Sequence, residues 1–334
     1  MKCRRQTRSV VVLVCFAAAL ALGSCTQGST AETAPVDLAL DVKSPFRFVV
    51  YGDTRFHNPA DTGPANPRAR KVLVEAIAGV NPSFICFTGD IVYNGYDAAD
   101  WAVWDQETSV WRSKNIPVYP ALGNHDLHGE AKVALGNYFR RFPALGESRY
   151  YSIRADKVLI LVLDSSLDET TGPQGDWLRA KLDHVPSDVG FVLVMDHHPP
   201  YTSSSDGMKF GGGHSARAKE QALAKALEAR QAEAPYRMVF FSGHVHNYER
   251  HEHGGITYFV SGGGGAHAYP IERAPGDPFQ SKEINYHYLL VEADHEQLNI
   301  TMKRVSFTGD APVWTSPDSV RIGNLKPAAR AVGR

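Results

Sequence analysis

Short apolar runs rich in β-branched and aromatic residues recur along the chain, and each of them closes on a glycine or an aspartate. Runs of this composition, bounded by residues that favour turns, are typical of buried β-strands. We therefore expect strands at FRFVVYG (46–52), SFICFTG (83–89), IPVYPALG (116–123), GFVLVMD (190–196), YRMVFFSG (236–243) and ITYFVSGG (256–263).

Elsewhere the apolar residues recur at helical spacing, which predicts helices at 68–80, 99–113 and 215–232. Strands that alternate with helices favour an α/β architecture with a largely parallel core. Four further apolar runs follow one another without helices and predict a second sheet or antiparallel additions; they lie at 150–156, 157–164, 286–293 and 298–305.

The two ends of the chain depart from this pattern. Residues 1–25 combine a basic start, a short apolar run and the small residues LGSC, which is the layout of a secretory signal peptide. The ending is similar to a bacterial lipobox, so we expect lipidation of Cys25, with a plain secreted protein cut nearby as the alternative. Residues 26–45 are small and polar and predict a flexible tether, and 306–334 predict an irregular tail.

Charge and cysteine content narrow the function classes. The net charge is -1, which gives no support for binding to nucleic acid or to an anionic membrane surface. Only Cys86 lies beyond Cys25, so we expect no internal disulfide in the exported chain. A protein of this kind is stabilised by its core or by a metal, and its 14 histidines are a source of metal ligands.

Metal-binding side chains follow five of the predicted strands, at the point where each strand ends. The carboxyl ends of strands in an open α/β sheet form the crevice in which ligands bind. The sequence therefore predicts that these side chains meet at one rim, with enough ligands for two metals. They are Asp53; Asp90 and Tyr93; Asn124, His125 and Asp126; His197 and His198; and His244 and His246.

Five short motifs, in this order along the chain, resemble those of the calcineurin-like metallophosphoesterases: GDT (52–54), GDIVY (89–93), GNHD (123–126), DHHPPY (196–201) and GHVHNYER (243–250). The resemblance implies an α/β fold, a four-layer αββα sandwich with two mixed β-sheets, as one domain over 46–305. Within the superfamily the motifs look most like those of the purple acid phosphatases in a short form. Arg55 stands where the general family has a histidine ligand, and a tyrosine three residues after Asp90 fills that gap. The first motif, Gly-Asp-Thr-Arg, departs from the Gly-Asp-x-Gly that is usual in purple phosphatases.

The resemblance implies two metal ions bridged by Asp90. It assigns Asp53, Asp90, Tyr93 and His246 to the first metal, and Asp90, Asn124, His197 and His244 to the second. A phenolate and carboxylates suit iron(III), whereas imidazole and an amide oxygen suit zinc, manganese or iron(II). A metal-bound hydroxide then attacks the phosphate, and no protein nucleophile is required.

Four other residues are candidates for catalysis or substrate binding. The family places the histidine of GNHD near the leaving oxygen, oriented by the acid that follows, so His125 and Asp126 are a candidate general acid and its partner. The alternative for this pair is that it only stiffens the turn. His198 is expected either behind the ligands or near the substrate, or else as a solvated loop residue. His214 follows a glycine-rich loop where purple phosphatases carry further histidines, which makes it a substrate-side candidate.

Two more features near the motifs concern the same site. Arg55 could bind a phosphate through its guanidinium, or it could pair with a nearby acid. The glycine run at 261–265 lacks the lysine and the serine or threonine of a P-loop. We interpret it as backbone that passes close to the metal site, where a side chain would clash.

These assignments predict an exported phosphatase that hydrolyses phosphate monoesters of small molecules. A phosphodiesterase or nucleotidase on the same metal scaffold is one alternative, and a lipoprotein that binds metal or a partner without turnover is another. The expected location is the bacterial cell envelope, with the membrane contacted only through a lipid anchor at Cys25, or otherwise outside the cell. The sequence makes no prediction of the oligomeric state.

Overall fold

The computed structural model describes residues 34–205 and 214–325. The expected signal peptide, Cys25 and the first part of the expected tether lie outside the described residues, as does the glycine-rich stretch before His214. Among the described residues, no helix has both the length and the apolar character to cross a membrane.

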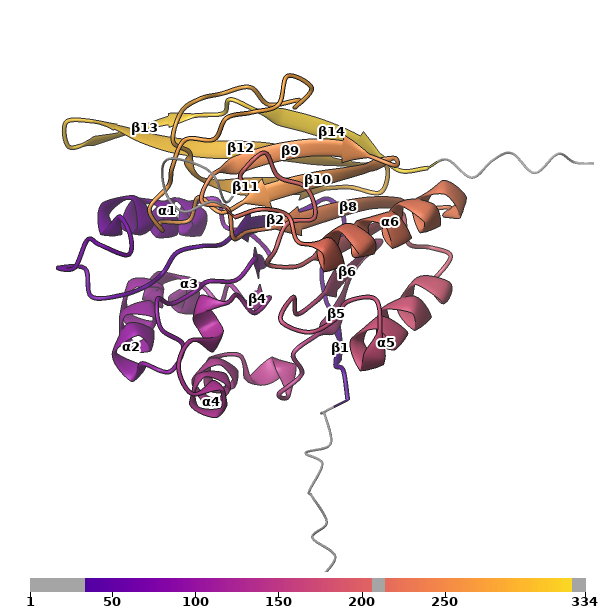
Figure 1. Cartoon of the computed structure of the whole chain (residues 1–334), viewed down its shortest axis with the longest axis horizontal. Coiled ribbons are helices and arrows are strands. Elements are labelled where there is room, and N and C mark those ends of the chain that lie inside the picture. The colour runs from indigo at the N-terminus through magenta and orange to yellow at the C-terminus, as the bar shows by residue number, and fades with distance from the viewer. Residues whose placement is uncertain (1–33, 206–213, 326–334) are drawn as a thin grey trace, which may run out of the picture. The chain divides into compact units, whose positions relative to one another are not determined.

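Two seven-stranded mixed sheets form the centre of the fold (Figure 1). The first sheet has the order β1-β5-β6-β7-β8-β10-β9, in which β6, β7, β8 and β10 are parallel. Its strands are β1 (Asp37–Leu40), β5 (Tyr151–Ala155), β6 (Val158–Val162), β7 (Phe191–Met195), β8 (Arg237–Ser242), β9 (Tyr248–His253) and β10 (Ile256–Ser261).

The second sheet has the order β13-β12-β11-β2-β3-β4, and β14 also pairs with β12. In this sheet β2, β3 and β4 are parallel and the other pairs are antiparallel. The strands are β2 (Phe46–Tyr51), β3 (Ile85–Phe87), β4 (Val118–Pro120), β11 (Tyr286–Ala293), β12 (Gln297–Thr308), β13 (Ala311–Thr315) and β14 (Ser319–Gly323).

Helices cover the outer faces of both sheets. The side chains of strand β7 point alternately to the two faces of its sheet, and both faces are covered, so the strand is buried along its whole length. Phe191, Leu193 and Met195 belong to the core between the sheets, whereas Val192 and Val194 pack in a second core with α5 (Gly172–Asp183) and α6 (Ala218–Glu233). The first core also takes in residues of α1 (Pro67–Gly79), α2 (Ala98–Glu107), α3 (Ser109–Ser113) and α4 (Ala131–Arg141). The layering confirms the expected four-layer αββα sandwich.

The expected strands that precede the metal-binding motifs are all present, but the expected boundaries of the domain were wrong. Asp37–Leu40, inside the expected tether, form β1 and pair with β5. The expected irregular tail contains β13 and β14, which both pair with β12. All five residues of β13 are exposed, so this strand depends on backbone pairing and not on an apolar pattern that a sequence could reveal. The helix expected at 99–113 is also two helices, α2 and α3, divided at Thr108.

Candidate metal centre

Five loops at the carboxyl ends of parallel strands supply the candidate ligands. They follow β2, β3 and β4 in the second sheet and β7 and β8 in the first, so the site lies where the two sheets meet. Asp53, Asp90 and His244 each have a positive φ, of 55°, 53° and 67°. Non-glycine residues adopt this conformation rarely and at a cost, and such residues are common at functional sites.

Backbone hydrogen bonds hold these turns together. The amide of His244 donates to both carboxylate oxygens of Asp53 at 3.0 Å. The amide of His125 donates to Asp90 Oδ1 at 2.8 Å. Carboxylates of the first two motifs therefore fix the positions of loops that come much later in the chain.

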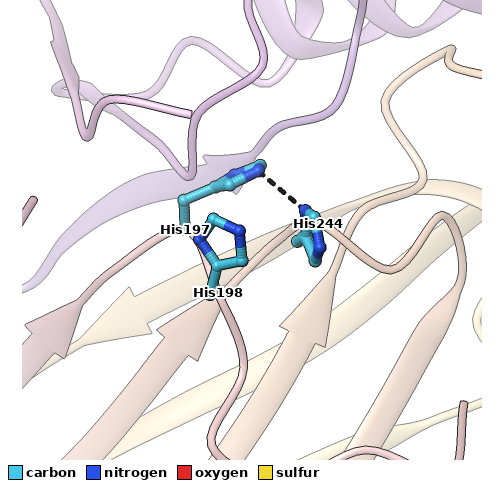
Figure 2. Close-up of side chains that lie close together, drawn as sticks. All are labelled: His197, His198 and His244. Atoms are coloured by element: carbon cyan, nitrogen blue, oxygen red, sulfur yellow. Dashed lines mark hydrogen bonds between the residues drawn. The ribbon is translucent and has the colours of Figure 1, made fainter. Parts of the chain in front are cut away.

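The ligands assigned to the second metal converge closely. His197 Nε2 and His244 Nδ1 face each other (Figure 2) and lie 3.2 Å apart. Both nitrogens are 3.1 Å from Asn124 Oδ1. Asp90 Oδ1 is 3.4 Å from His197 Nε2. The carbonyl of Thr88 is 2.8 Å from His197 Nδ1 and can only accept, so Nδ1 carries the hydrogen and Nε2 offers its lone pair. Two nitrogens and two oxygens that face one another in this way suit a divalent cation.

The ligands assigned to the first metal leave buried polar atoms without partners. His246 Nδ1 is 2.9 Å from the carbonyl of His267, and His246 Nε2 points toward Asp53, with 3.8 Å to Oδ1. Among the described residues, neither His246 Nε2 nor Asp90 Oδ2 has a hydrogen-bond partner, although both are buried. Such atoms are rare in native proteins unless something else satisfies them, and a cation would satisfy both.

The electrostatics of the site also fit metal binding. Burial lowers the pKa of His197, His244 and His246, so these imidazoles are neutral and can act as ligands. Burial and then the neighbouring Asp90 raise the pKa of Asp53. Burial alone would raise the pKa of Asp90 too, but His197, His125 and Arg55 together hold it below its usual range. A bound cation would favour the ionised form of both carboxylates.

Tyr93 and His125 lie side by side. Their rings stack with centroids 5.3 Å apart, and the carbonyl of Tyr93 accepts a hydrogen bond from His125 Nδ1 at 2.7 Å. This leaves Nε2 as the nitrogen of His125 that can exchange a proton. Burial lowers the pKa of His125 to about 4, an effect that Asp90 opposes and Arg55 reinforces.

The expected pairing of Asp126 with His125 is not what the structure shows. Asp126 is fully buried, and its carboxylate accepts hydrogen bonds from the amides of Ile91, Val92 and Gly123 at 2.9, 3.3 and 2.9 Å. It therefore joins the loop after β3 to the loop after β4. The carbonyl of Tyr93, and not Asp126, orients the His125 ring.

His198 and His214 both lie at the site. The ring of His198 lies beside that of His244 (Figure 2), with 4.0 Å between their centroids. His198 Nδ1 is 2.8 Å from the hydroxyl of Ser165. It is buried, so the solvated-loop alternative is wrong. The ring of His214 is 4.2 Å from that of His244, and its Nδ1 is 3.0 Å from the Tyr269 hydroxyl.

Arg55 pairs with an acid, which is one of its two expected alternatives. One of its terminal nitrogens, Nη2, is 3.6 Å from Asp90 Oδ2, and its side chain is only 16 % exposed. The glycine run behaves as expected, because a Cβ at Gly264 would come within 2.0 Å of the carbonyl oxygen of Gly52.

Three residues of the site gave no signal in the sequence. Thr88 and Ser165 act through single contacts with His197 and His198. Tyr269 lies in an irregular segment, and its hydroxyl contacts both the amide of His246, at 3.3 Å, and the ring of His214. No periodicity or motif marks a residue that acts through a single hydroxyl, as Ser165 and Tyr269 do, or through a backbone carbonyl, as Thr88 does.

Several known proteins resemble this chain in sequence. Purple acid phosphatase 23 of Arabidopsis thaliana is 29% identical over 178 residues, which cover 51% of this chain and 36% of that protein. A probable cyclic nucleotide phosphodiesterase of Rhodococcus erythropolis is 31% identical over 153 residues, which cover 44% of this chain and 48% of that protein. The matches thus span less than half the length of either relative.

Solved structures share the fold. A purple acid phosphatase from yellow lupin seeds superimposes with a TM-score of 0.61 at 19% identity, over 84% of this chain and 54% of that one. A dimetal phosphatase from Danio rerio gives a TM-score of 0.52 at 14% identity, over 84% and 99%. The family model of the calcineurin-like phosphoesterases matches residues 46–248, which include the first four motifs and the fifth as far as Tyr248. This chain therefore belongs to the calcineurin-like phosphoesterase family, and its relatives within that family include purple acid phosphatases.

Proposed function

We propose that this protein is a phosphatase that hydrolyses phosphate monoesters at a centre of two metal ions. The observation that carries the proposal is the convergence of donors from five loops, with two buried donor atoms, Asp90 Oδ2 and His246 Nε2, left without partners among the described residues. If these five loops served only to connect strands, there would be no reason for metal-ligand atoms to be buried there without hydrogen-bond partners.

The residues of the site have separate roles in the proposed reaction. Bound metal ions would neutralise the phosphate charge and lower the pKa of water. Asp90 lies between the two ligand groups and serves both. His125, with Nδ1 held by the carbonyl of Tyr93, presents Nε2 as the atom that moves a proton to the leaving oxygen. His198 and His214 lie against His244 and are placed to contact the substrate.

For the metals, we propose iron(III) at the site that includes Tyr93. A phenolate with the carboxylates of Asp53 and Asp90 is a hard, anionic donor set. The second site, with His197, His244 and the amide oxygen of Asn124, suits zinc, manganese or iron(II). The neutral state of the buried histidines supports their role as ligands.

For the cellular location, we propose export and lipid anchoring at Cys25. The support is the signal-like start of the chain and the LGSC ending. The alternative is a plain secreted protein cut near Cys25, and membrane fractionation distinguishes the two.

A phosphodiesterase is the second candidate function. One relative of this chain is described as a probable cyclic nucleotide phosphodiesterase, and it matches at 31% identity. The same metal ligands can serve either ester, because the metal ions that they would hold contact the phosphoryl group, which both esters share.

The test is to measure bound metal in the purified protein and to compare its rates on an aryl monophosphate and on the corresponding diester. We expect two metal ions per chain and faster hydrolysis of the monoester. Faster hydrolysis of the diester would favour the second candidate. Bound metal without turnover of either ester would make the protein a metal-binding lipoprotein, and the proposal would be wrong. Asn124→Ala is expected to lose the second metal, which ties the activity to the site.

A further inference from the structure

Arg55 brings a positive charge into a pocket that is built to bind cations. Its Nη2 lies 3.6 Å from Asp90 Oδ2, which is an ionic contact but longer than a hydrogen bond. That oxygen is the same buried atom that has no hydrogen-bond partner among the described residues. The guanidinium therefore faces the donor that the first metal ion would use.

The backbone fixes Arg55 at this position. Its φ is 46°, its amide donates to the carbonyl of Asp90 at 3.1 Å, and its carbonyl accepts from the buried Arg70 at 3.1 Å. Arg70 is itself held by both carboxylate oxygens of Glu107. The start of the side chain thus points into the site whether or not a metal is present.

The far end of the side chain is held much less firmly. Arg55 Nε is buried and, within the described parts of the chain, has no hydrogen-bond partner. A guanidinium that served only as a structural ion pair would be expected to bind a carboxylate through two hydrogen bonds. The loose contact instead suits a group that can leave Asp90.

We propose that Arg55 is an internal counter-ion that competes with the first metal ion for Asp90. The inference rests on the proposed two-metal site and concerns the affinity of one half of it. Two buried carboxylates, Asp53 and Asp90, lie beside each other, and each raises the cost of ionising the other. When the first metal is absent, the guanidinium offsets that charge. When the metal binds, the two positive charges repel, so Arg55 lowers the affinity of the first site.

The test is a calorimetric titration of the full-length, metal-free protein with Zn²⁺, which measures the affinity of each site. The variants are Arg55→Gln, which removes the charge, and Arg55→Lys, which keeps it. Arg47→Gln is the matched control, because Arg47 is exposed on β2. We expect Arg55→Gln to tighten the first site by at least about tenfold, or ~1.4 kcal/mol, and to leave the second site unchanged. Arg55→Lys and Arg47→Gln should resemble the wild type.

A second pair of variants identifies which site responds. His246 is assigned to the first metal alone, so the gain from Arg55→Gln should vanish in a His246→Ala background. A first-site affinity that is unchanged or weaker in Arg55→Gln would overturn the role of Arg55, and so would a gain that persists without His246. If both the wild type and Arg55→Gln bind fewer than two Zn²⁺ ions, and neither takes up iron(III) at the first site, the two-metal function and the role of Arg55 are both wrong.

Thermal unfolding gives a readout that does not depend on fitting two sites. Metal-free Arg55→Gln should melt at a lower temperature than the metal-free wild type, because the buried carboxylates lose their counter-ion. Saturating Zn²⁺ should reduce that difference, because a ligand that binds the native state more tightly stabilises it more. Equal melting temperatures of the metal-free proteins would contradict the proposal.

Discussion

Replacing Asp126 by asparagine tests whether this carboxylate positions the metal-binding loops. Its Oδ1 accepts from the amides of Ile91 and Val92, and its Oδ2 accepts from the amide of Gly123. These bonds connect the two loops that carry Asp90 and Asn124. Asparagine keeps the shape of the side chain, but its amide has only one acceptor oxygen. The variant must therefore lose the bond on one side and point an NH₂ group at a buried amide.

The size of the effect follows from that lost bond. A hydrogen bond to a charged group contributes about 1.5–3 kcal/mol, and an unsatisfied buried donor costs about 1–3 kcal/mol. A net loss of about 2–3 kcal/mol corresponds to a fall in melting temperature of roughly 3–5 °C for a domain that spans residues 34–325, because the entropy of unfolding grows with chain length at about 2.1 cal/mol/K per residue. Burial and the neighbouring Asp90 raise the pKa of Asp126 to about 8, so the comparison is made above that pH, where the carboxylate is ionised.

The assay is thermal unfolding followed by circular dichroism, together with Zn²⁺ affinity. Asp41→Asn is the control, because Asp41 is exposed and lies away from the motifs. We expect Asp126→Asn to melt earlier and to bind the second metal more weakly, since Asp90 and Asn124 both depend on the bridge. If the variant kept its melting temperature and its metals but lost turnover, Asp126 would act by orienting His125, and the reasoning from the three amides would be refuted.

Four further predictions concern single side chains. His125→Ala should keep both metals and lower kcat on alkyl phosphates by about 10²–10⁴-fold, with much less effect on activated aryl phosphates; equal slowing on both substrates would make His125 structural. Tyr93→Phe should abolish the visible absorption band of the iron-loaded protein, and a colourless wild type with stoichiometric iron(III) would exclude the phenolate ligand. Cys25→Ser should move the protein from the membrane to the soluble fraction, and unchanged fractionation would exclude the anchor. Burial and then Glu220 raise the pKa of Glu169 to about 7 from 4.5, so the native state keeps a proton that the unfolded state loses, and stability falls as the pH rises through this range. Glu169→Gln should flatten that fall in denaturant unfolding, and an unchanged slope would contradict it.

The strands that precede the candidate metal ligands could be predicted because the sequence pattern of each strand is local. Each is a short apolar run, and each ends at a turn where the ligand stands. In β7 the whole run is buried on both faces, which is why it reads as continuous apolar sequence. The convergence of five such loops followed from the rule that the ends of parallel strands meet at one rim.

The strands at the margins of the fold could not be predicted in the same way. In β13 every residue is exposed, and β1 alternates between exposed and half-buried residues without a fully buried one. Both strands are at the ends of their sheets and are fixed by backbone hydrogen bonds to one neighbour. Strand β1 does carry an alternating pattern, because Leu38 and Leu40 pack against the core, but four residues are too few for the pattern to stand out among the small polar residues before them.

The role of Asp126 shows why adjacency in a motif is a poor guide to contact. His125 and Asp126 begin a 3₁₀ turn that spans His125–Leu127. Such a turn has three residues per revolution, so neighbouring side chains point in directions about 120° apart. His125 consequently meets the carbonyl of Tyr93, while Asp126 points to two amides of the loop after β3 and to the amide of Gly123 in its own loop. The two residues are neighbours in the motif, but their side chains contact different groups.

Arg55 illustrates a related point about alternatives that a sequence leaves open. Binding a phosphate and pairing with an acid look like competing roles when only residue types are known. The structure places the guanidinium beside Asp90, in ionic contact but without a hydrogen bond, and leaves Nε without a partner among the described residues. A side chain whose backbone is clamped and whose charged end is loosely held can serve first one anion and then another. If a metal ion takes over Asp90, the released guanidinium remains in the pocket with its donors unsatisfied, and the anion that enters next is the phosphate of the substrate. On this proposal, the two roles would be successive states of one residue.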